Sequence, residues 1–173
     1  EPPNGDDSRE FSPFVKNQSA YFASLNREKE SIKLDLKDTE DKLIFNNLLK
    51  QADILIENYK PGTMEKLGYG FNYLKNKFPN LIYASCSGFG QTGPWSKKPA
   101  YDMIVQGMGG LMSVTGYENQ EPVRVGTSIG DIAAGLFTTI GILSALLDRH
   151  NNNKGQSIDV SMLDCQIAIL ENA

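Results

Sequence analysis

The sequence predicts an α/β fold built around a mainly parallel sheet. Two short, nearly continuous apolar runs, 53–58 and 81–86, have the length and composition of strands that are buried on both faces. Helix-like segments separate these runs, and an alternating segment, 156–162, follows a long apolar helical stretch. Strands that alternate with helices at such short spacing are typical of a parallel sheet covered by helices.

The first fifty residues contain weaker signals. Residues 1–20 are polar and rich in turn formers, so we expect a loop. The segment 32–36 alternates apolar and polar residues after the mainly apolar segment 20–25, and this alternation predicts a strand. Asp38 has the position of a helix N-cap, and apolar residues then recur on one face up to residue 51.

The elements after residue 60 follow from glycine and proline positions and from apolar periodicity. The Pro61-Gly62 turn predicts a helix start near residue 63, and a second helix is expected around 73–78. Residues 88–94 contain too many turn formers for a regular element. Three more helices are expected, at 101–112 with a break at Gly109-Gly110, at 132–149, and from 163 onward.

Composition places the chain among ordinary soluble globular proteins. Of its 173 residues 40% are hydrophobic and 22% charged, which fits one domain or a piece of a larger one. The net charge of -4 gives no reason to expect nucleic acid or an anionic membrane as a partner. No signal peptide is found, and the apolar stretch 132–147 is shorter than a membrane span. Since the chain opens abruptly without an initiator Met and stops within an apolar helical pattern, we expect a piece of a longer protein.

Cysteine and histidine usage argues against a metal site. Cys86 and Cys165 have no metal-ligand spacing and lie in apolar or strand-like surroundings, so free thiols in a reducing compartment are expected. The single histidine, His150, follows a helix end and is expected at the surface. We therefore predict no metal and no permanently bound cofactor.

Asp131 is the first candidate for chemistry. It follows a glycine-rich approach that begins at Gly126 and ends at Gly130, and it precedes the long apolar helix. A helix N-terminus favours a negative charge, and glycine allows backbone or ligand to come close. Two interpretations stay open from this stretch alone: Asp131 caps the helix, or it is a reactive carboxylate.

Three segments follow the expected carboxyl ends of strands or lead to Asp131, and ligands bind at that edge of open α/β sheets. They are 58–62, 87–90 and the approach to Asp131. Lys60 and Lys66 flank the first segment beside a helix N-terminus that could hold a phosphate. A surface turn with two solvated lysines explains the same residues equally well.

Several common chemistries lack their motifs. No G-x-G-x-x-G opens a helix after a strand, and no P-loop or G-x-S-x-G nucleophile elbow occurs. With one histidine in the chain, acid–base or covalent chemistry has to use carboxylate, tyrosine or lysine side chains.

The motifs of this chain, in their order, resemble those of the family III CoA-transferases, the CaiB/BaiF superfamily that includes formyl-CoA transferase. They lie in 1–9, 26–37, 56–62, 88–94, 101–102, 130–131 and 154–162. The resemblance implies a Rossmann-like large domain, a smaller second domain and a homodimer of interlocked subunits. It also implies that residues 1–173 are the central part of the large domain. The first strand–helix unit, the small domain and the C-terminal return would then be absent, and the isolated piece is expected to be inactive.

The resemblance assigns roles to residues of this chain. Asp131 takes the place of the nucleophile, which attacks an acyl-CoA thioester and forms an aspartyl mixed anhydride before CoA passes to a carboxylic acid acceptor. The positions of the CoA contacts fall on Leu34, Lys37, Asn58, Tyr59, Lys60, Lys66, Tyr101 and Asp102. Gly130 and Met162 take substrate-pocket positions, although Met162 also suits core packing. A further basic position of the family falls on Pro99, beside Lys97 and Lys98.

Two alternatives accompany this hypothesis. The α-methylacyl-CoA racemases resemble Gly-His-Asp where this chain has Ala100-Tyr101-Asp102, and without that histidine half of an acid–base pair is missing. A non-catalytic CoA-binding or dimerisation module would bind CoA without any need for Asp131.

Residues 90–94 and 121–124 resemble the dicarboxylate branch (succinyl-CoA, glutarate) more than the formyl branch. We expect a soluble intracellular protein of the cytoplasm, or of the mitochondrial matrix if the glutarate branch applies.

Overall fold

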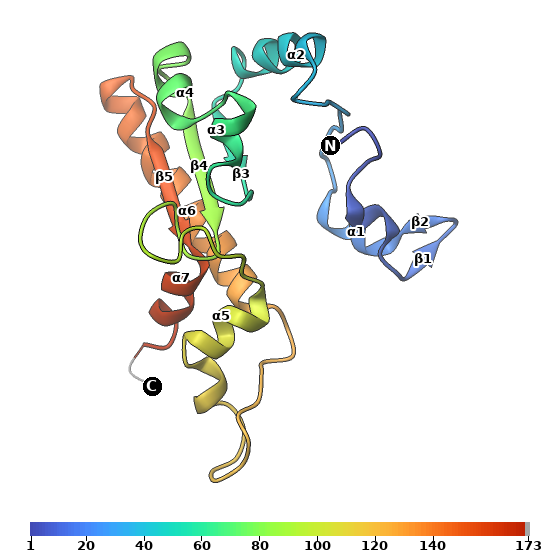
Figure 1. Ribbon diagram of the computed structural model, residues 1–173, viewed down its shortest axis with the longest axis vertical. Coiled ribbons are helices and arrows are strands. Elements are labelled where there is room, and N and C mark those ends of the chain that lie inside the picture. The colour runs from blue at the N-terminus through green and yellow to red at the C-terminus, as the bar shows by residue number, and fades with distance from the viewer. Residues whose placement is uncertain (172–173) are drawn as a thin grey trace. The chain divides into compact units, whose positions relative to one another are not determined.

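The computed structural model describes residues 1–171 (Figure 1). Contacts within the chain divide it into two compact units, Glu1–Lys50 and Gln51–Ala173, and each unit is described here by itself. The second unit contains the parallel sheet and most of the candidate site residues.

The first unit opens with more structure than the expected loop. A 3-10 helix, η1 (Asp7–Glu10), precedes a small antiparallel hairpin of β1 (Phe14–Val15) and β2 (Gln18–Ser19). Lys16 and Asn17 form its turn with φ of 50° and 62°. Positive φ at both central residues is the geometry of a tight two-residue hairpin, for which Asn-Gly is the usual signal. The loop prediction for 1–20 is therefore wrong. The hairpin was not predicted because its two turn residues are Lys16-Asn17 rather than the usual Asn-Gly.

Two helices complete the first unit. Helix α1 (Ala20–Leu25) is capped by Ser19, and α2 (Thr39–Leu49) by the Asp38 carboxylate, which accepts from the N–H groups of Glu40 and Asp41 at 2.8 and 3.0 Å. The helix predicted from Asp38 is confirmed. The strand predicted at 32–36 is wrong, because no strand pairs with this segment in the described part of the chain.

The second unit alternates strands and helices as predicted. Its first half is β3 (Ile54–Glu57), α3 (Thr63–Leu67), α4 (Phe71–Lys77) and β4 (Ile82–Ser87). Its second half is α5 (Asp102–Met108), η2 (Leu111–Val114), α6 (Ile129–Asn152), β5 (Ser157–Ser161) and α7 (Met162–Ala168). The helix expected at 101–112 breaks at Gly109-Gly110, as the two glycines indicated.

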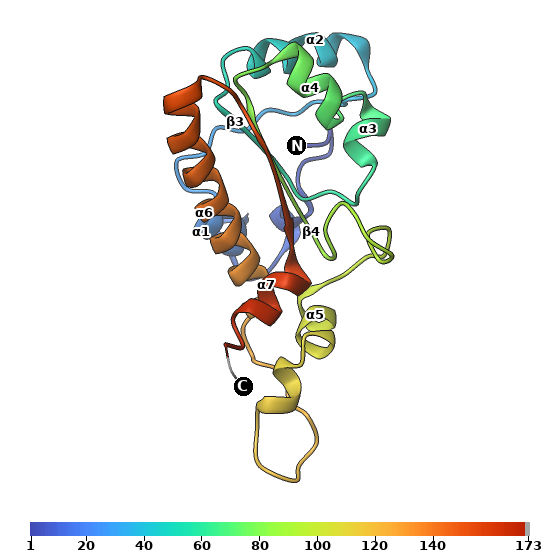
Figure 2. The same cartoon turned by 90° about the vertical axis from the view of Figure 1, so that its left-hand side faces the viewer.

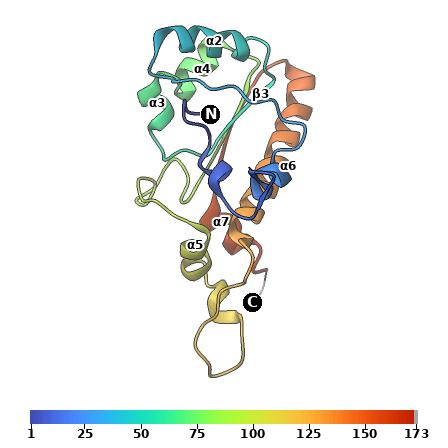
Figure 3. The same cartoon turned by 90° about the vertical axis from the view of Figure 1, so that its right-hand side faces the viewer.

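The three strands form a parallel sheet in the order β3-β4-β5. Ile54 pairs with Ile82 and Tyr83 with Ser157, so all three strands end at the same edge of the sheet. Helix α6 covers one face, while α3 and α4 lie on the opposite face (Figures 2 and 3). The parallel α/β prediction is confirmed.

Core packing fixes the elements around the carboxyl edge of the sheet. One buried cluster joins α5, α6, β5 and α7, and its members are Val105, Ala133, Ala134, Val160, Met162 and Cys165. Small residues on α6 allow the helix to approach the sheet closely. The cluster therefore holds the start of α6 against α5 and α7, where the candidate nucleophile lies.

Helix α6 is longer than the apolar stretch that predicts it. Its 24 residues are long and apolar enough to cross a membrane by length and composition, contrary to the expectation from the sequence. A core helix of a soluble protein meets the same criterion, and one face of α6 packs on β4 and β5. At its C-terminus Asn153 adopts the left-handed conformation (φ 55°), which ends the helix.

Candidate active site

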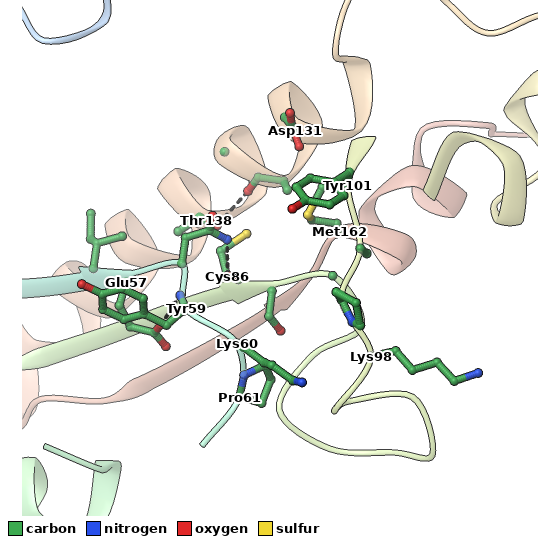
Figure 4. A pocket seen from close by; sticks show the side chains of 18 of the residues that line it. Glu57, Tyr59, Lys60, Pro61, Cys86, Lys98, Tyr101, Asp131, Thr138 and Met162 are labelled. Atoms are coloured by element: carbon green, nitrogen blue, oxygen red, sulfur yellow. Dashed lines mark hydrogen bonds between the residues drawn. The ribbon is translucent and has the colours of Figure 1, made fainter. Parts of the chain in front are cut away.

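A pocket of about 700 Å³ opens beyond the carboxyl ends of β3 and β4. Its wall contains residues 56–61 at and after the end of β3, residues 86–88 at the end of β4, and the first turns of α6 from Asp131. Of the segments that the sequence placed at this edge, 58–61 and 87–88 line the pocket together with Asp131, whereas the approach 126–130 does not. Residues 98–101 and Met162 complete the wall (Figure 4). The sheet topology thus brings together residues that are far apart in the sequence.

Asp131 lies in the first turn of α6, and its side chain is exposed to the pocket. The surrounding chain removes part of its hydration, and this raises the pKa of the Asp131 carboxyl; the nearby Asp102 carboxylate raises it further. No side chain caps the N-terminus of α6 from the N-cap position, Ser128. Asp131 therefore faces the pocket with an ionisable oxygen that the helix terminus can stabilise in its charged form.

The turn after β3 places three of the predicted CoA contacts in the pocket wall. Asn58, Tyr59 and Lys60 all line the pocket, and all three are exposed. The Asn58 side-chain amide donates to the carbonyl oxygen of Cys86 at 2.5 Å, which ties this turn to the end of β4. The side chains of Tyr59 and Lys60 stay exposed to a ligand.

Glu57 is a pocket residue that the sequence did not single out. Its carboxylate is buried and accepts two hydrogen bonds, from the Tyr59 N–H at 2.6 Å and from the Tyr83 hydroxyl at 3.0 Å. Burial raises the pKa of Glu57 despite these donors. The only signal in the sequence was an acidic residue at the end of an otherwise apolar strand. We interpret Glu57 as the residue that fixes the backbone of the Tyr59 turn.

Cys86 also lines the pocket, at the end of β4. Burial raises the pKa of its thiol, so at neutral pH the sulfur is protonated and a poor nucleophile. Cys165 is buried in the core, where burial raises its pKa to about 11. Both thiols are free, as the sequence predicted.

The loop between β4 and α5 contributes Lys98, Pro99, Ala100 and Tyr101 to the pocket. Of the two lysines beside Pro99, Lys98 is therefore the one in the wall, and its ammonium group lies 5.0 Å from the centre of the Trp95 ring. In Figure 4 the side chains of Lys60 and Lys98 lie on the far side of the pocket from Asp131. The pocket thus has a carboxylate at one end and two cations at the other.

The glycines of this loop have the spacing of a dinucleotide-binding motif without its context. Gly88, Gly90 and Gly93 match G-x-G-x-x-G directly after β4, but no helix begins there and α5 starts only at Asp102. That motif binds a pyrophosphate at the N-terminus of the helix that it opens. The glycine spacing of this loop therefore does not indicate a dinucleotide-binding site, and the loop contributes Gly88 to the pocket wall.

Three other predicted site residues of the second unit, Lys66, Asp102 and Gly130, do not line the pocket. Lys66 is exposed on α3, and Gly130 is buried at the start of α6. Asp102 is buried, and its carboxylate accepts from the Gly130 N–H and from the Gln106 amide. Leu34 and Lys37 belong to the first unit, where Leu34 is half-buried and Lys37 exposed. Their role in CoA binding stays a prediction.

Among residues 1–171 no three His, Cys, Asp or Glu side chains come together in a group that could hold a metal ion. The polar groups that the pocket wall offers include the exposed carboxylate of Asp131, the ammonium groups of Lys60 and Lys98, and the hydroxyls of Tyr59 and Tyr101.

Comparison with known proteins gives consistent matches over the whole chain. The model of CoA-transferase family III matches residues 1–173. An acetyl-CoA:oxalate CoA-transferase of Acetobacter aceti is 51% identical over 100% of this chain and 45% of its own length. A succinyl-CoA:glutarate CoA-transferase of Mus musculus is 42% identical over 98% of this chain and 39% of its own. The chain thus spans less than half the length of these relatives.

Solved structures agree with the fold. A CAIB/BAIF family protein from Brucella suis superposes with a TM-score of 0.94 and 41% identity, over 99% of this chain and 47% of that chain. The Rv3272 protein of Mycobacterium tuberculosis superposes with a TM-score of 0.90 and 31% identity, over 99% and 49% of the two chains.

Proposed function

This chain belongs to CoA-transferase family III, and on that premise we propose that the whole protein transfers CoA from an acyl-CoA to a carboxylic acid, with Asp131 as the nucleophile. The observation that supports this assignment is the position of Asp131. It is an open carboxylate at a helix N-terminus, facing a pocket with two lysines at its other end. A helix cap alone would not require the carboxylate to face a pocket of this size.

The chemistry follows from this arrangement. A carboxylate oxygen of Asp131 attacks the thioester carbonyl carbon, the C–S bond breaks, and CoA leaves as a thiolate, so an aspartyl mixed anhydride forms. The thiolate then attacks the aspartyl carbonyl, which releases the donor acid and leaves an aspartyl thioester. The acceptor carboxylate attacks that thioester, CoA leaves again, and the resulting anhydride is cleaved by the thiolate. Acceptor acyl-CoA and the free Asp131 carboxylate are the products, and no net proton is consumed.

Different residues of the pocket would bind different parts of CoA. Lys60 and Lys98 are suited to the phosphate groups of CoA, because an ammonium group is a point charge that accepts several phosphate geometries. Asn58, Tyr59 and Tyr101 line the same pocket and are available to contact the extended part of CoA. Backbone N–H groups at the start of α6 would stabilise the oxyanion that develops during each attack.

A dicarboxylic acid is the acceptor class that we propose. The relatives are named for oxalate, glutarate, mesaconate and D-citramalate, all of which have two carboxyl groups. The segments 90–94 and 121–124 point to the same branch. The central position of residues 1–173 in a larger domain, the interlocked homodimer, and the cytoplasm or mitochondrial matrix as compartment stay predictions.

A trapping experiment on the whole protein tests the mechanism. The protein is incubated with succinyl-CoA, treated with hydroxylamine, and digested for mass spectrometry, beside Asp131→Ala and Asp131→Asn variants. We expect modification at Asp131 that requires acyl-CoA, and a loss of transfer of about a thousandfold or more in both variants.

Two other outcomes would each reject the proposal. Deuterium from solvent in the acyl α-carbon, with Asp131 unmodified, would indicate racemase-type proton transfer. CoA binding that survives in Asp131→Ala, with neither deuterium exchange nor a trapped intermediate in the wild type, would indicate a binding module. Parallel assays with oxalate, glutarate and a monocarboxylate test the acceptor class separately.

A further inference from the structure

A buried polar cluster lies behind Asp131, on the side of α6 that faces α5. It consists of Asp102 and Gln106 on α5 and the backbone of residues 125–130. Asp102 is 9% exposed and Gln106 is completely buried. Buried carboxylate and amide groups are unfavourable unless their hydrogen bonds are satisfied, so a fully bonded cluster at this depth has a specific geometry.

Gln106 ties the approach to α6 onto α5. Its side-chain oxygen accepts from the Val125 N–H at 2.9 Å, and its amide nitrogen donates to Asp102 at 2.7 Å. The same nitrogen lies 3.4 and 3.3 Å from the carbonyl oxygens of Val125 and Thr127. One side chain thus uses both of its polar atoms to hold the segment that leads to Asp131.

Asp102 replaces the missing cap of α6. Its second carboxylate oxygen accepts from the Gly130 N–H at 2.8 Å, although Ser128 at the N-cap position provides no side-chain bond. The close approach requires glycine at residue 130, because a Cβ there would lie 2.7 Å from the Val105 side chain and 3.1 Å from Asp102. The residue directly before the nucleophile is therefore held by a carboxylate from another helix.

We propose that Asp102 and Gln106 are positioning residues for Asp131, and that Asp102 acts on α6 rather than on CoA. The expected effect on kcat rests on the proposed function, whereas the attachment of α6 by Asp102 and Gln106 does not. Because a misplacement of a reacting group by about 1 Å can reduce a rate a hundredfold, a rigid attachment beside the nucleophile has a catalytic consequence.

The charge of Asp102 gives the cluster a measurable signature. It is the charged group that raises the pKa of Asp131 in addition to burial. The remaining ionisable groups that line the pocket are Glu57, Tyr59, Lys60, Cys86, Lys98 and Tyr101, which come from β3, β4 and the loops that follow them. Removal of the Asp102 charge should lower the pKa of Asp131. Removal of any of the other charges leaves the hydrogen bond between the Gly130 N–H and Asp102 in place.

The first test separates attachment from charge in the whole protein. Asp102→Asn keeps an oxygen acceptor for the Gly130 N–H, but it removes the charge and replaces the acceptor of the Gln106 amide with a donor. Asp102→Ala removes the charge and both acceptors. Titration of carboxyl-¹³C aspartate, with the Asp131 signal assigned by its loss in Asp131→Asn, should show a lower Asp131 pKa in Asp102→Asn. An unchanged Asp131 titration in a folded Asp102→Asn protein would overturn the electrostatic coupling, whatever the reaction of the enzyme.

Kinetics then distinguish positioning from CoA binding. Asp102→Ala should lower kcat by about a hundredfold with KM for acyl-CoA nearly unchanged, and Asp102→Asn, which keeps the acceptor for the Gly130 N–H, should restore part of kcat. In Asp102→Asn the acidic limb of the kcat profile should move to lower pH, because Asp131 then stays ionised further into acid. A large rise of KM with kcat preserved in Asp102→Ala would overturn the proposal and support a direct contact with CoA.

A matched pair of glutamines controls for simple packing. Gln106→Met removes the side-chain hydrogen bonds of Gln106. Gln166→Met changes a residue that is also completely buried but whose amide has no partner among the described residues. We expect Gln106→Met to lower kcat at least about tenfold more than Gln166→Met at equal thermal stability. Equal kcat in the two variants would reject the role of Gln106.

If no CoA transfer occurs in the wild type, the proposed function fails while the Asp131 titration still reports on the cluster.

Discussion

The two ends of the parallel sheet differ in how their polar groups are used. At the amino ends Arg149 donates to the carbonyl oxygens of Asn80 at 2.9 Å and Asp53 at 3.3 Å, and to the Asp53 carboxylate at 2.8 Å. At the carboxyl ends Asp131, Lys60 and Lys98 line an open pocket. At the amino end the charged groups bond to each other and to the backbone beside a smaller hollow of about 390 Å³, and at the carboxyl end they face the larger pocket of about 700 Å³.

The difference follows from the backbone geometry of a parallel sheet. At the carboxyl edge the chain leaves each strand through loops, here 58–62 and 88–101, so a hollow forms between them. At the amino edge the loop after α6 is pressed against the loop before β4, and the Gly155 N–H donates to the Pro79 carbonyl at 2.8 Å. Substitutions at the amino end should therefore change stability, and those at the carboxyl end should change kinetics.

The largest effect on stability is expected from Gly155. A Cβ at this residue would lie 2.0 Å from the Leu81 carbonyl oxygen and 2.6 Å from its carbon, both in the backbone. Since the backbone cannot move aside as a side chain does, Gly155→Val should lower the free energy of unfolding by about 3 kcal/mol or more. Urea unfolding of the whole protein measures the change. Gly126→Ala is the control, because no atom lies within 4 Å of its added Cβ, and an equally large loss there would contradict the steric explanation.

A smaller effect on stability is expected from Arg149. Arg149→Met keeps the apolar stem and removes the donors to Asn80 and Asp53, which should cost about 1–2 kcal/mol. The ion pair itself contributes little of this, because the Asp53 side chain is 73% exposed. Thermal unfolding and kcat are measured together, and kcat should change less than twofold if the two ends are independent. A loss of activity at unchanged stability would show that the ends are coupled.

The amino acid sequence predicted the parallel sheet and its pocket edge because both depend on local patterns. Short apolar runs determined β3 and β4, and turn formers determined the loops after them. The hairpin at Lys16-Asn17 was missed because its turn residues are unusual, and the strand predicted at 32–36 lacked a pairing partner in the described chain. Sheet pairing depends on residues far away in the sequence, so alternation alone cannot establish it.

The site was predictable where a residue follows a strand and unpredictable where its role depends on packing. Asn58, Tyr59, Lys60, Tyr101, Asp131 and Met162 all line the pocket. Glu57 and Cys86 were missed because a buried strand residue has no distinguishing sequence pattern. The bond of Asp102 to Gly130 joins helices α5 and α6, and spacing along the sequence does not reveal such a contact.

At the carboxyl end, the two lysines should affect substrate binding alone. Lys60→Ala and Lys98→Ala should each raise KM for acyl-CoA roughly two- to fivefold, or about 0.4–1 kcal/mol, which lies within the range of an exposed ion pair. The rise should shrink as salt is added, and kcat should stay unchanged. Lys75→Ala, on α4 and outside the pocket wall, is the control. Unchanged KM in the double variant would mean that both lysines are only solvated.

The smallest effect, on stability, is expected from Asp131 itself, and its sign separates the two interpretations of this residue. Burial and the Asp102 carboxylate raise the pKa of Asp131 in the folded protein, so ionisation disfavours folding. The stability associated with the raised pKa is present below the pKa of the unfolded chain and is lost as pH rises through the folded value. Asp131→Asn should therefore be more stable than the wild type at pH 7, by less than about 1 kcal/mol after screening in an open pocket, and equal to it in acid. Thermal unfolding from about pH 3 to 8 measures this difference, and the gain should shrink in an Asp102→Asn background. If Asp131→Asn were instead less stable than the wild type at neutral pH, the charge of Asp131 would stabilise α6 as a helix cap does. The result would contradict the interpretation of Asp131 as a reactive carboxylate whose ionisation lowers the stability of the folded protein.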